Sequence, residues 1–139
     1  MMGKEALSSA FSEMILEEAK KDKDIVVVCT DSRGSAKLGA YPDEVPEQFV
    51  EMGIAEQNSV TVSAGMAYMG KKVFTIGPAS FYSMRSAEQV KVDVAYSHNN
   101  VTVIGISGGI SYGALGATHH SLQDISLMRA IPGLTVMIP

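Results

Sequence analysis

The run DIVVVCT at residues 24–30, a string of β-branched residues without polar alternation, constrains the fold more than any other feature of the sequence. A strand with one face toward water alternates apolar and polar residues, whereas a strand covered on both faces is apolar throughout. This run is therefore typical of a parallel sheet flanked by helices. Similar runs recur at 72–76, 101–106 and 134–139, so the sequence predicts at least four strands.

Helical patterns lie between these runs. Apolar residues recur at three- and four-residue spacing in 5–20, which indicates an amphipathic helix. Segments 55–70 and 86–98 are long enough to be crossover helices, and the first of them ends at Gly70. Its small residues on nearly all sides predict a buried helix, with another subunit as one possible neighbour.

A short helix is expected within 121–133, because Ser121 and Asp124 have the spacing of a capping box and Pro132 and Gly133 would end the helix. The alternation of strands and helices predicts an α/β fold with an open, mainly parallel sheet and helices on both faces. The polar loop at 31–48 is long, and long loops in compact domains are often functional.

Composition limits the size of the fold and the classes of partner. The chain has 139 residues, 46% of them hydrophobic, which suits one domain over residues 1–139. Its net charge is −4 and its Lys and Arg residues are scattered, so we expect neither nucleic acid nor an anionic membrane as a partner. No signal peptide and no apolar run of about 18 residues is present, and Cys29 is the only cysteine. These features predict a cytoplasmic protein.

Ligands of such sheets bind at the carboxyl ends of the strands. Residues 31–35, 77–81 and 107–120 follow predicted strands, and Glu56 stands at the start of a predicted helix. Each feature also has an ordinary structural interpretation. An acid in the first turn complements the helix dipole, an Asp closes a turn, and an aromatic residue packs in the core.

Two other site classes are not supported. His119 and His120 are adjacent on a loop with only Asp124 nearby, which is no zinc ligand set, so no metal site is predicted. No G-x-S-x-G segment occurs, so nothing indicates a serine nucleophile.

Three segments carry a resemblance to a known family: FVEMGIAEQN (49–58), AGMAYMGKKVFTIGPASF (64–81) and GATHHSLQDISLMRAIPGLTV (116–136). In their order and their residues, these segments resemble the pyrimidine-binding (Pyr) domain of transketolases, which use thiamine diphosphate. The resemblance extends over nearly the whole chain. The resemblance implies the Pyr fold and the transfer of a two-carbon ketol unit between sugar phosphates in carbohydrate metabolism, as in the pentose phosphate pathway.

The resemblance also implies roles for single residues. Glu56 matches the acid that hydrogen-bonds N1′ of the aminopyrimidine and favours its imino tautomer, and Phe81 matches the aromatic residue that stacks on that ring. Asp31 matches an acid near the thiazolium end of the cofactor. Ser35 matches a serine that binds substrate phosphate, and His119 matches a histidine that faces the reacting centre.

Several positions depart from the family pattern. The family carries a His near Ser107 and an acid at Leu115, both of which hold sugar hydroxyls, and an aromatic residue at Pro78. Lys4 falls roughly where the family has a phosphate-binding Arg. We therefore expect substrate contacts at Ser107 and Leu115, with a donor or acceptor whose hydroxyl pattern or branching differs from xylulose 5-phosphate and ribose 5-phosphate.

The family binds the diphosphate and Mg²⁺ in a separate domain with a G-D-G…N motif, which this sequence lacks. The resemblance therefore implies half of a split enzyme, or a fragment of that half. It also implies a diphosphate-binding (N-terminal) transketolase subunit as partner, a homodimer formed through Pyr domains, and an isolated chain that is inactive.

Other members of the same fold remain alternatives. The β subunit of a 2-oxo acid dehydrogenase E1 component shares the fold and an I-A-E segment, but LMRAIPGLTV and the short span before VTVIG favour transketolase. Deoxyxylulose-phosphate synthases keep both cofactor domains on one chain. A non-catalytic partner-binding module would have no need of Glu56, Phe81 and His119 together.

Overall fold

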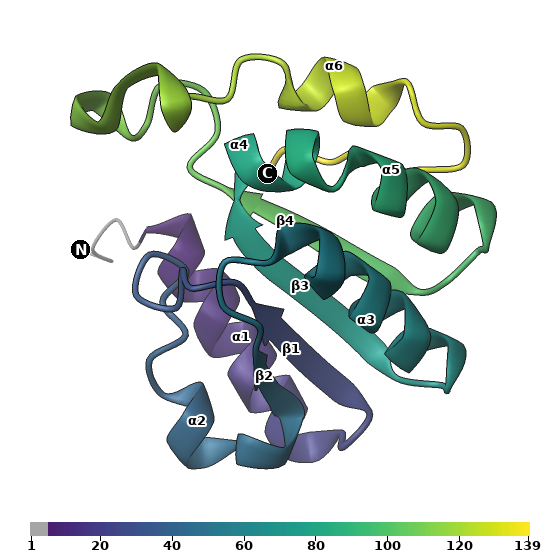
Figure 1. The fold of residues 1–139 in the computed structure, drawn as a ribbon. Helices are drawn as coiled ribbons and strands as arrows, with labels where there is room; N and C mark the ends of the chain where they lie inside the picture. The colour runs from purple at the N-terminus through teal and green to yellow at the C-terminus, as the bar shows by residue number, and fades with distance from the viewer. Residues whose placement is uncertain (1–5) are drawn as a thin grey trace.

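A computed structural model describes residues 6–139, and Lys4 lies outside them. Its core is a four-stranded sheet in the order β2-β1-β3-β4, in which every neighbouring pair is parallel (Figure 1). The strands are β1 Ile25–Cys29, β2 Phe49–Glu51, β3 Lys72–Pro78 and β4 Val101–Ile106. This confirms the predicted α/β class and three of the four predicted strands.

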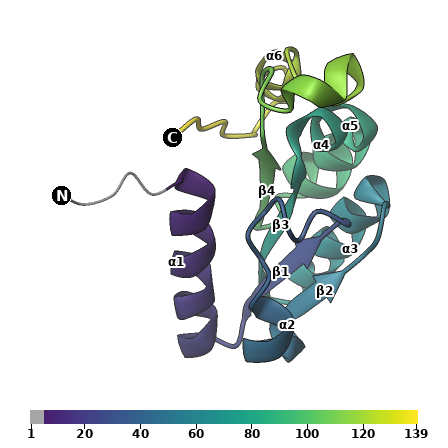
Figure 2. The same cartoon turned by 90° about the vertical axis from the view of Figure 1, so that its left-hand side faces the viewer.

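Helices cover both faces of the sheet, as expected. Figure 2 shows α1 on one face, with α3, α4 and α5 on the other. The α-helices are α1 Leu7–Lys21, α2 Tyr41–Glu44, α3 Glu56–Tyr68, α4 Ala79–Arg85, α5 Ala87–Gln89 and α6 Asp124–Arg129. Two 3-10 turns, η1 Pro46–Gln48 and η3 Gly113–Thr118, and a π-helix, η2 Val90–Tyr96, complete the elements. None of the helices described is long and apolar enough to cross a membrane.

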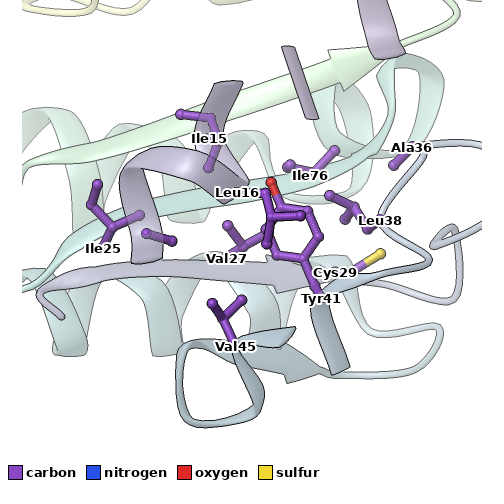
Figure 3. Close-up of a cluster of buried hydrophobic side chains, with 11 residues drawn as sticks. Ile15, Leu16, Ile25, Val27, Cys29, Ala36, Leu38, Tyr41, Val45 and Ile76 are labelled. Carbon is purple, nitrogen blue, oxygen red and sulfur yellow. The ribbon is translucent and has the colours of Figure 1, made fainter. Parts of the chain in front are cut away.

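The core beneath α1 takes side chains from a segment that the sequence presents as a polar loop. Leu38, Tyr41 and Val45 are buried there with Val27 and Ile76 (Figure 3). The Tyr41 hydroxyl also donates a 2.7 Å hydrogen bond to the carbonyl oxygen of Ser12 in α1. Much of the 31–48 loop is therefore packed against α1 and β1, a structural role that its polar sequence did not predict.

The predicted strand at 134–139 is wrong. These residues have no regular structure, although Leu134 packs against the cluster around Val60 and Tyr82. An apolar run is a local signal, whereas a strand exists only when a neighbour supplies its ladder hydrogen bonds. The strand that the sequence did not predict, β2, has only three residues and pairs with β1 at the edge of the sheet.

In this single chain, the predicted burial of the helix at 55–70 holds on one side. Helix α3 is buried on only one side: Ser59, Val60 and Ser63 are inside, while Gln57 and Tyr68 are exposed, and the chain leaves it through Gly70 at φ +96°. The isolated protein therefore does not bury this helix all round.

The capping box at 121–124 does not form. The N-cap of α6 is Gln123, without a side-chain capping bond, and the hydroxyl of Ser121 is buried without a partner. The backbone of Ser121 is instead paired with Gly109 in an isolated antiparallel bridge, which draws it away from the helix.

Candidate functional site

The carboxyl ends of the four strands lie at one edge of the sheet because all pairs are parallel. Asp31 follows β1, α4 begins directly after β3, and Ser107 follows β4. Asp31 and Ser107 both take left-handed backbone conformations, with φ of 51° and 55°. These conformations are uncommon for residues other than glycine, so both strands end in sharp changes of direction.

Glu56 is the first residue of α3 and the most deeply buried acid of the site. Only 4% of its surface is exposed. The helix dipole favours a negative charge here, but a buried carboxylate also needs an ionic or hydrogen-bonding partner. Arg85, the last residue of α4, supplies it: Nη1 lies 3.2 Å from both carboxylate oxygens.

A surface depression of about 530 Å³ opens beside this ion pair. Ile54, Ala55, Gln57 and Asn58 line it together with the paired side chains. The guanidinium of Arg85 forms part of its rim, since that side chain is 48% exposed. The carboxylate of Glu56 is therefore both desolvated and close to an open space.

The same arginine contacts an aromatic group. Arg85 Cζ lies 4.1 Å from the centroid of the Phe81 ring, a cation–π contact between residues one helical turn apart. The ring of His119 stands 5.2 Å from Phe81 at 65°, and Tyr112 stands 5.6 Å from His119 at 72°. We call Glu56, Arg85, Phe81, His119 and Tyr112 the site row.

Buried hydroxyl groups hold α3 and α4 together behind the site row. Ser59 Oγ lies 2.7 Å from Thr75 Oγ1 and 2.8 Å from the Tyr82 hydroxyl, which is 2.9 Å from Thr75 Oγ1. Burial raises the pKa of Tyr82, so the neutral hydroxyl is the form that bridges the elements. Since Tyr82 follows Phe81 and Ser59 lies one turn after Glu56, this triangle fixes the spacing of the two site residues.

A separate pair of hydrogen bonds holds the turn that follows β1, where Asp31 lies. The backbone N–H of Asp31 donates to Glu51 Oε1 at 2.7 Å, and that oxygen also accepts from Gly53 N at 3.1 Å. Glu51 thus fastens the turn after β1 to the segment that leads into α3. The side chains of Asp31 and Ser35 are exposed, and no hydrogen bond or ion pair within residues 6–139 joins them to the row.

The residues predicted to contact sugar lie on the loop after β4. Gly109 and Ser121 exchange two backbone hydrogen bonds of 2.8 Å, which close this loop at its base. Leu115 lies in η3 with 54% of its surface exposed, and Ser107 is half-buried at the loop's start. Of the predicted residues on this loop, the structure brings His119 into the site row.

Sequence reasoning missed Arg85, Tyr112 and Glu51. The signal for Arg85 was present, because it stands four residues after Phe81 on one helix face, the spacing of a cation–π pair. Tyr112 and Glu51 had no local signal, since both act through residues distant in the sequence.

The arrangement suits a flat ring with nitrogen donors. Phe81 offers an aromatic face, and Glu56 offers buried acceptor oxygens beside it. The Arg85 guanidinium, a planar N–H donor, already makes both contacts. The aminopyrimidine of thiamine diphosphate has the same planar shape and can share a proton with a carboxylate, so the residues present fit that part of the cofactor. Within residues 6–139, no three His, Cys, Asp or Glu residues gather as potential metal ligands.

Comparisons with known proteins agree with this fit. The family described as "Transketolase, pyrimidine binding domain" matches residues 4–139. An apulose-4-phosphate transketolase subunit of Phocaeicola vulgatus is 59% identical over 134 residues, which make up 96% of this chain and 43% of that protein. A protein of the same name from Actinobacillus succinogenes is 40% identical over 139 residues, 100% of this chain and 45% of its own length.

A solved structure described as a split gene transketolase, an inactive beta4 tetramer, superposes with a TM-score of 0.75 at 32% identity. The match covers 88% of this chain and 39% of that one. The chain therefore spans less than half the length of these relatives. Their names favour a transketolase subunit over the β subunit of a 2-oxo acid dehydrogenase.

Proposed function

The chain belongs to the family of transketolase pyrimidine-binding domains, and from that premise we propose that it forms the aminopyrimidine half of a split transketolase site. The enzyme would transfer a two-carbon ketol unit between sugar phosphates with thiamine diphosphate as cofactor. The observation that carries this proposal is the buried carboxylate of Glu56. It binds the planar guanidinium of Arg85, which lies over the ring of Phe81.

Each side chain has a separate task in this proposal. Glu56 would share a proton with N1′ of the aminopyrimidine, and its low exposure would keep water from competing for that hydrogen bond. Phe81 orients the ring by stacking on it. When bound, thiamine diphosphate supplies the nucleophilic carbon of its thiazolium ring, which the protein side chains lack.

The other assignments concern the substrate and the rest of the cofactor. His119 lies against Phe81, and its Nδ1 is 3.0 Å from the hydroxyl of Thr118, which orients the ring. We assign His119 a hydrogen bond to the reacting sugar. Asp31 would lie near the thiazolium, and Ser35 would bind substrate phosphate; their support is their position after β1, at the carboxyl edge of the sheet.

The substrate that we propose is a ketose phosphate whose hydroxyl pattern or branching differs from that of xylulose 5-phosphate. The relative with 59% identity is named for apulose 4-phosphate, which makes this sugar phosphate the first candidate. Here Leu115 and Ser107 stand where other transketolases hold sugar hydroxyls with an acid and a histidine. An apolar side chain cannot form a hydrogen bond with a sugar hydroxyl at that position. The replacement of the acid by Leu115 therefore suits a donor with a different hydroxyl pattern.

A complete site would need further parts. We propose a diphosphate-binding subunit that holds Mg²⁺ and the diphosphate, a dimer formed through paired Pyr domains, and a cytoplasmic location. The relatives described as a transketolase subunit and as a split gene transketolase support a partner subunit.

The test is cofactor binding and activation in the full-length protein assembled with a diphosphate-binding transketolase subunit. Calorimetry should show Mg²⁺-dependent binding of thiamine diphosphate, and exchange of its C2 proton should be fast. Glu56→Gln should slow this exchange by about 10²-fold or more, because Gln cannot hold the shared proton. The exposed Glu47, changed to Gln, is the control and should leave exchange unchanged.

Wild-type exchange rates in Glu56→Gln would contradict the role of this carboxylate. Tight cofactor binding without exchange or ketol transfer in the wild-type complex would instead favour a non-catalytic module of the same fold.

A further inference from the structure

The guanidinium of Arg85 makes the two contacts that the proposed function gives to the aminopyrimidine. Nη1 lies 3.2 Å from each oxygen of Glu56, and Cζ lies 4.1 Å from the centroid of Phe81. A flat group that donates N–H to Glu56 while it covers Phe81 describes the guanidinium and the cofactor ring equally well. The two groups are therefore candidates for the same space.

Neither contact is easily shared. Only 4% of the surface of Glu56 is exposed, so few directions are open to a second donor, and one arginine nitrogen already engages both of its oxygens. The ring of His119 approaches Phe81 as well, at 5.2 Å and 65°. A ring that stacks on the face of Phe81 now covered by Arg85 requires the guanidinium to move away.

We propose that Arg85 is an internal occupant of the aminopyrimidine subsite, which pairs with Glu56 while the subsite is empty and leaves Phe81 when the cofactor enters. This inference rests on the proposed function, because it takes Glu56 and Phe81 as the cofactor's contacts. It adds that Arg85 competes with the cofactor ring for Glu56 and Phe81, which limits the affinity for thiamine diphosphate.

The energetics suit an occupant that can be displaced. An unpaired buried carboxylate is strongly unfavourable, so the empty site gains from the arginine. The Arg85 side chain is nevertheless 48% exposed and ends α4, so its charge can return to water without unfolding the helix. The arginine end of the ion pair is half-exposed, and partly solvated pairs and surface cation–π contacts are weak enough for a tightly bound cofactor to replace.

The test compares thiamine diphosphate affinity among variants of the full-length protein in complex with its diphosphate-binding subunit. Arg85→Met retains an unbranched side chain but removes the charge and the planar group. It should bind the cofactor about three- to thirty-fold more tightly than the wild type, as expected for the loss of a weak internal competitor. Arg85→Lys keeps a positive charge to pair with Glu56 but lacks the planar group. Its affinity for thiamine diphosphate should lie between those of the wild type and Arg85→Met.

Arg129→Met is the matched control, because it removes the same charge from an exposed position on α6. Its affinity should stay within about two-fold of the wild type, since changes of exposed side chains outside a site usually have small effects. A crystal structure of the wild-type complex with thiamine diphosphate gives a second, independent measurement. In it, Arg85 Cζ should lie beyond the cation–π range of about 6 Å from the Phe81 centroid.

The outcomes separate this inference from the function on which it rests. Equal affinity in the wild type and both Arg85 variants, with Arg85 still over Phe81 in the cofactor-bound structure, would overturn the displacement and leave the proposed function intact. A well-folded complex that binds no thiamine diphosphate in any variant would overturn both. If Arg85→Met fails to fold, Arg85→Lys and the wild-type structure decide the question.

Discussion

Gly77→Ala should destabilise the protein severely, because a methyl group at this position has no space. Gly77 lies in β3 in ordinary strand conformation, so its backbone would tolerate alanine. An added Cβ, however, would clash with Tyr82 Cε2 and would lie 2.7 Å from Thr30 Oγ1. Real Cβ atoms essentially never approach other atoms within 3.0 Å, so the Tyr82 ring must move.

The size of the loss follows from what Tyr82 holds. Overpacking a filled core costs about 1–3 kcal/mol. A displaced ring also loses the hydroxyl contacts of 2.8 Å to Ser59 and 2.9 Å to Thr75. Each net hydrogen bond contributes about 1 kcal/mol, so we expect a total loss of about 3–5 kcal/mol in the free energy of unfolding.

Urea unfolding measures this change. Gly39→Ala is the control, since no atom lies within 4 Å of its added Cβ, and it should cause no loss. The double variant Gly77→Ala with Tyr82→Ala should lose less than the sum of the single changes, because removing the ring removes the closer of the two clashes. A Gly77→Ala protein within about 0.5 kcal/mol of the wild type would refute the reasoning, since that is the range of ordinary surface substitutions.

Two further predictions concern the site. In the assembled enzyme, Phe81→Ala should weaken thiamine diphosphate binding by about 1–3 kcal/mol through lost stacking and burial, measured by calorimetry; unchanged affinity would exclude stacking on this ring. The wild type should show a higher kcat/KM for apulose 4-phosphate than for xylulose 5-phosphate with a common acceptor, and Leu115→Asp should narrow the difference. Efficient use of xylulose 5-phosphate by the wild type, without gain in Leu115→Asp, would show that Leu115 does not determine the donor.

The fold was predictable where local pattern and long-range pairing agree. The β-branched run at 24–30 and the apolar runs at 72–76 and 101–106 form β1, β3 and β4, because each lies between two pairing strands or beside one. The run at 134–139 has a similar apolar composition but no partner strand within residues 6–139, and it remains irregular. Conversely, β2 has three residues, too few for any periodicity to mark it.

The site was predictable in part. The resemblance to transketolases, now confirmed by comparison at the level of the family, predicted roles for Glu56, Phe81 and His119, and the structure joins these three residues through Arg85 and ring contacts. What the sequence alone did not indicate was the ion pair that buries Glu56. It joins two residues 29 positions apart, and it exists only because α3 and α4 pack on the same face of the sheet.

The bridge between Gly109 and Ser121 closes one part of the candidate site as a loop with its own base. The groups that we propose for the cofactor ring, Glu56 and Phe81, stand on α3 and α4, whereas Leu115 and His119 stand on the loop that the bridge closes. Because the bridge uses backbone atoms alone, side chains within the loop can be exchanged without opening its base. Mutations at Leu115 could therefore alter the sugar contact that we propose there while the loop keeps its base, whereas the contacts proposed at Ser35 and Ser107 lie outside this loop.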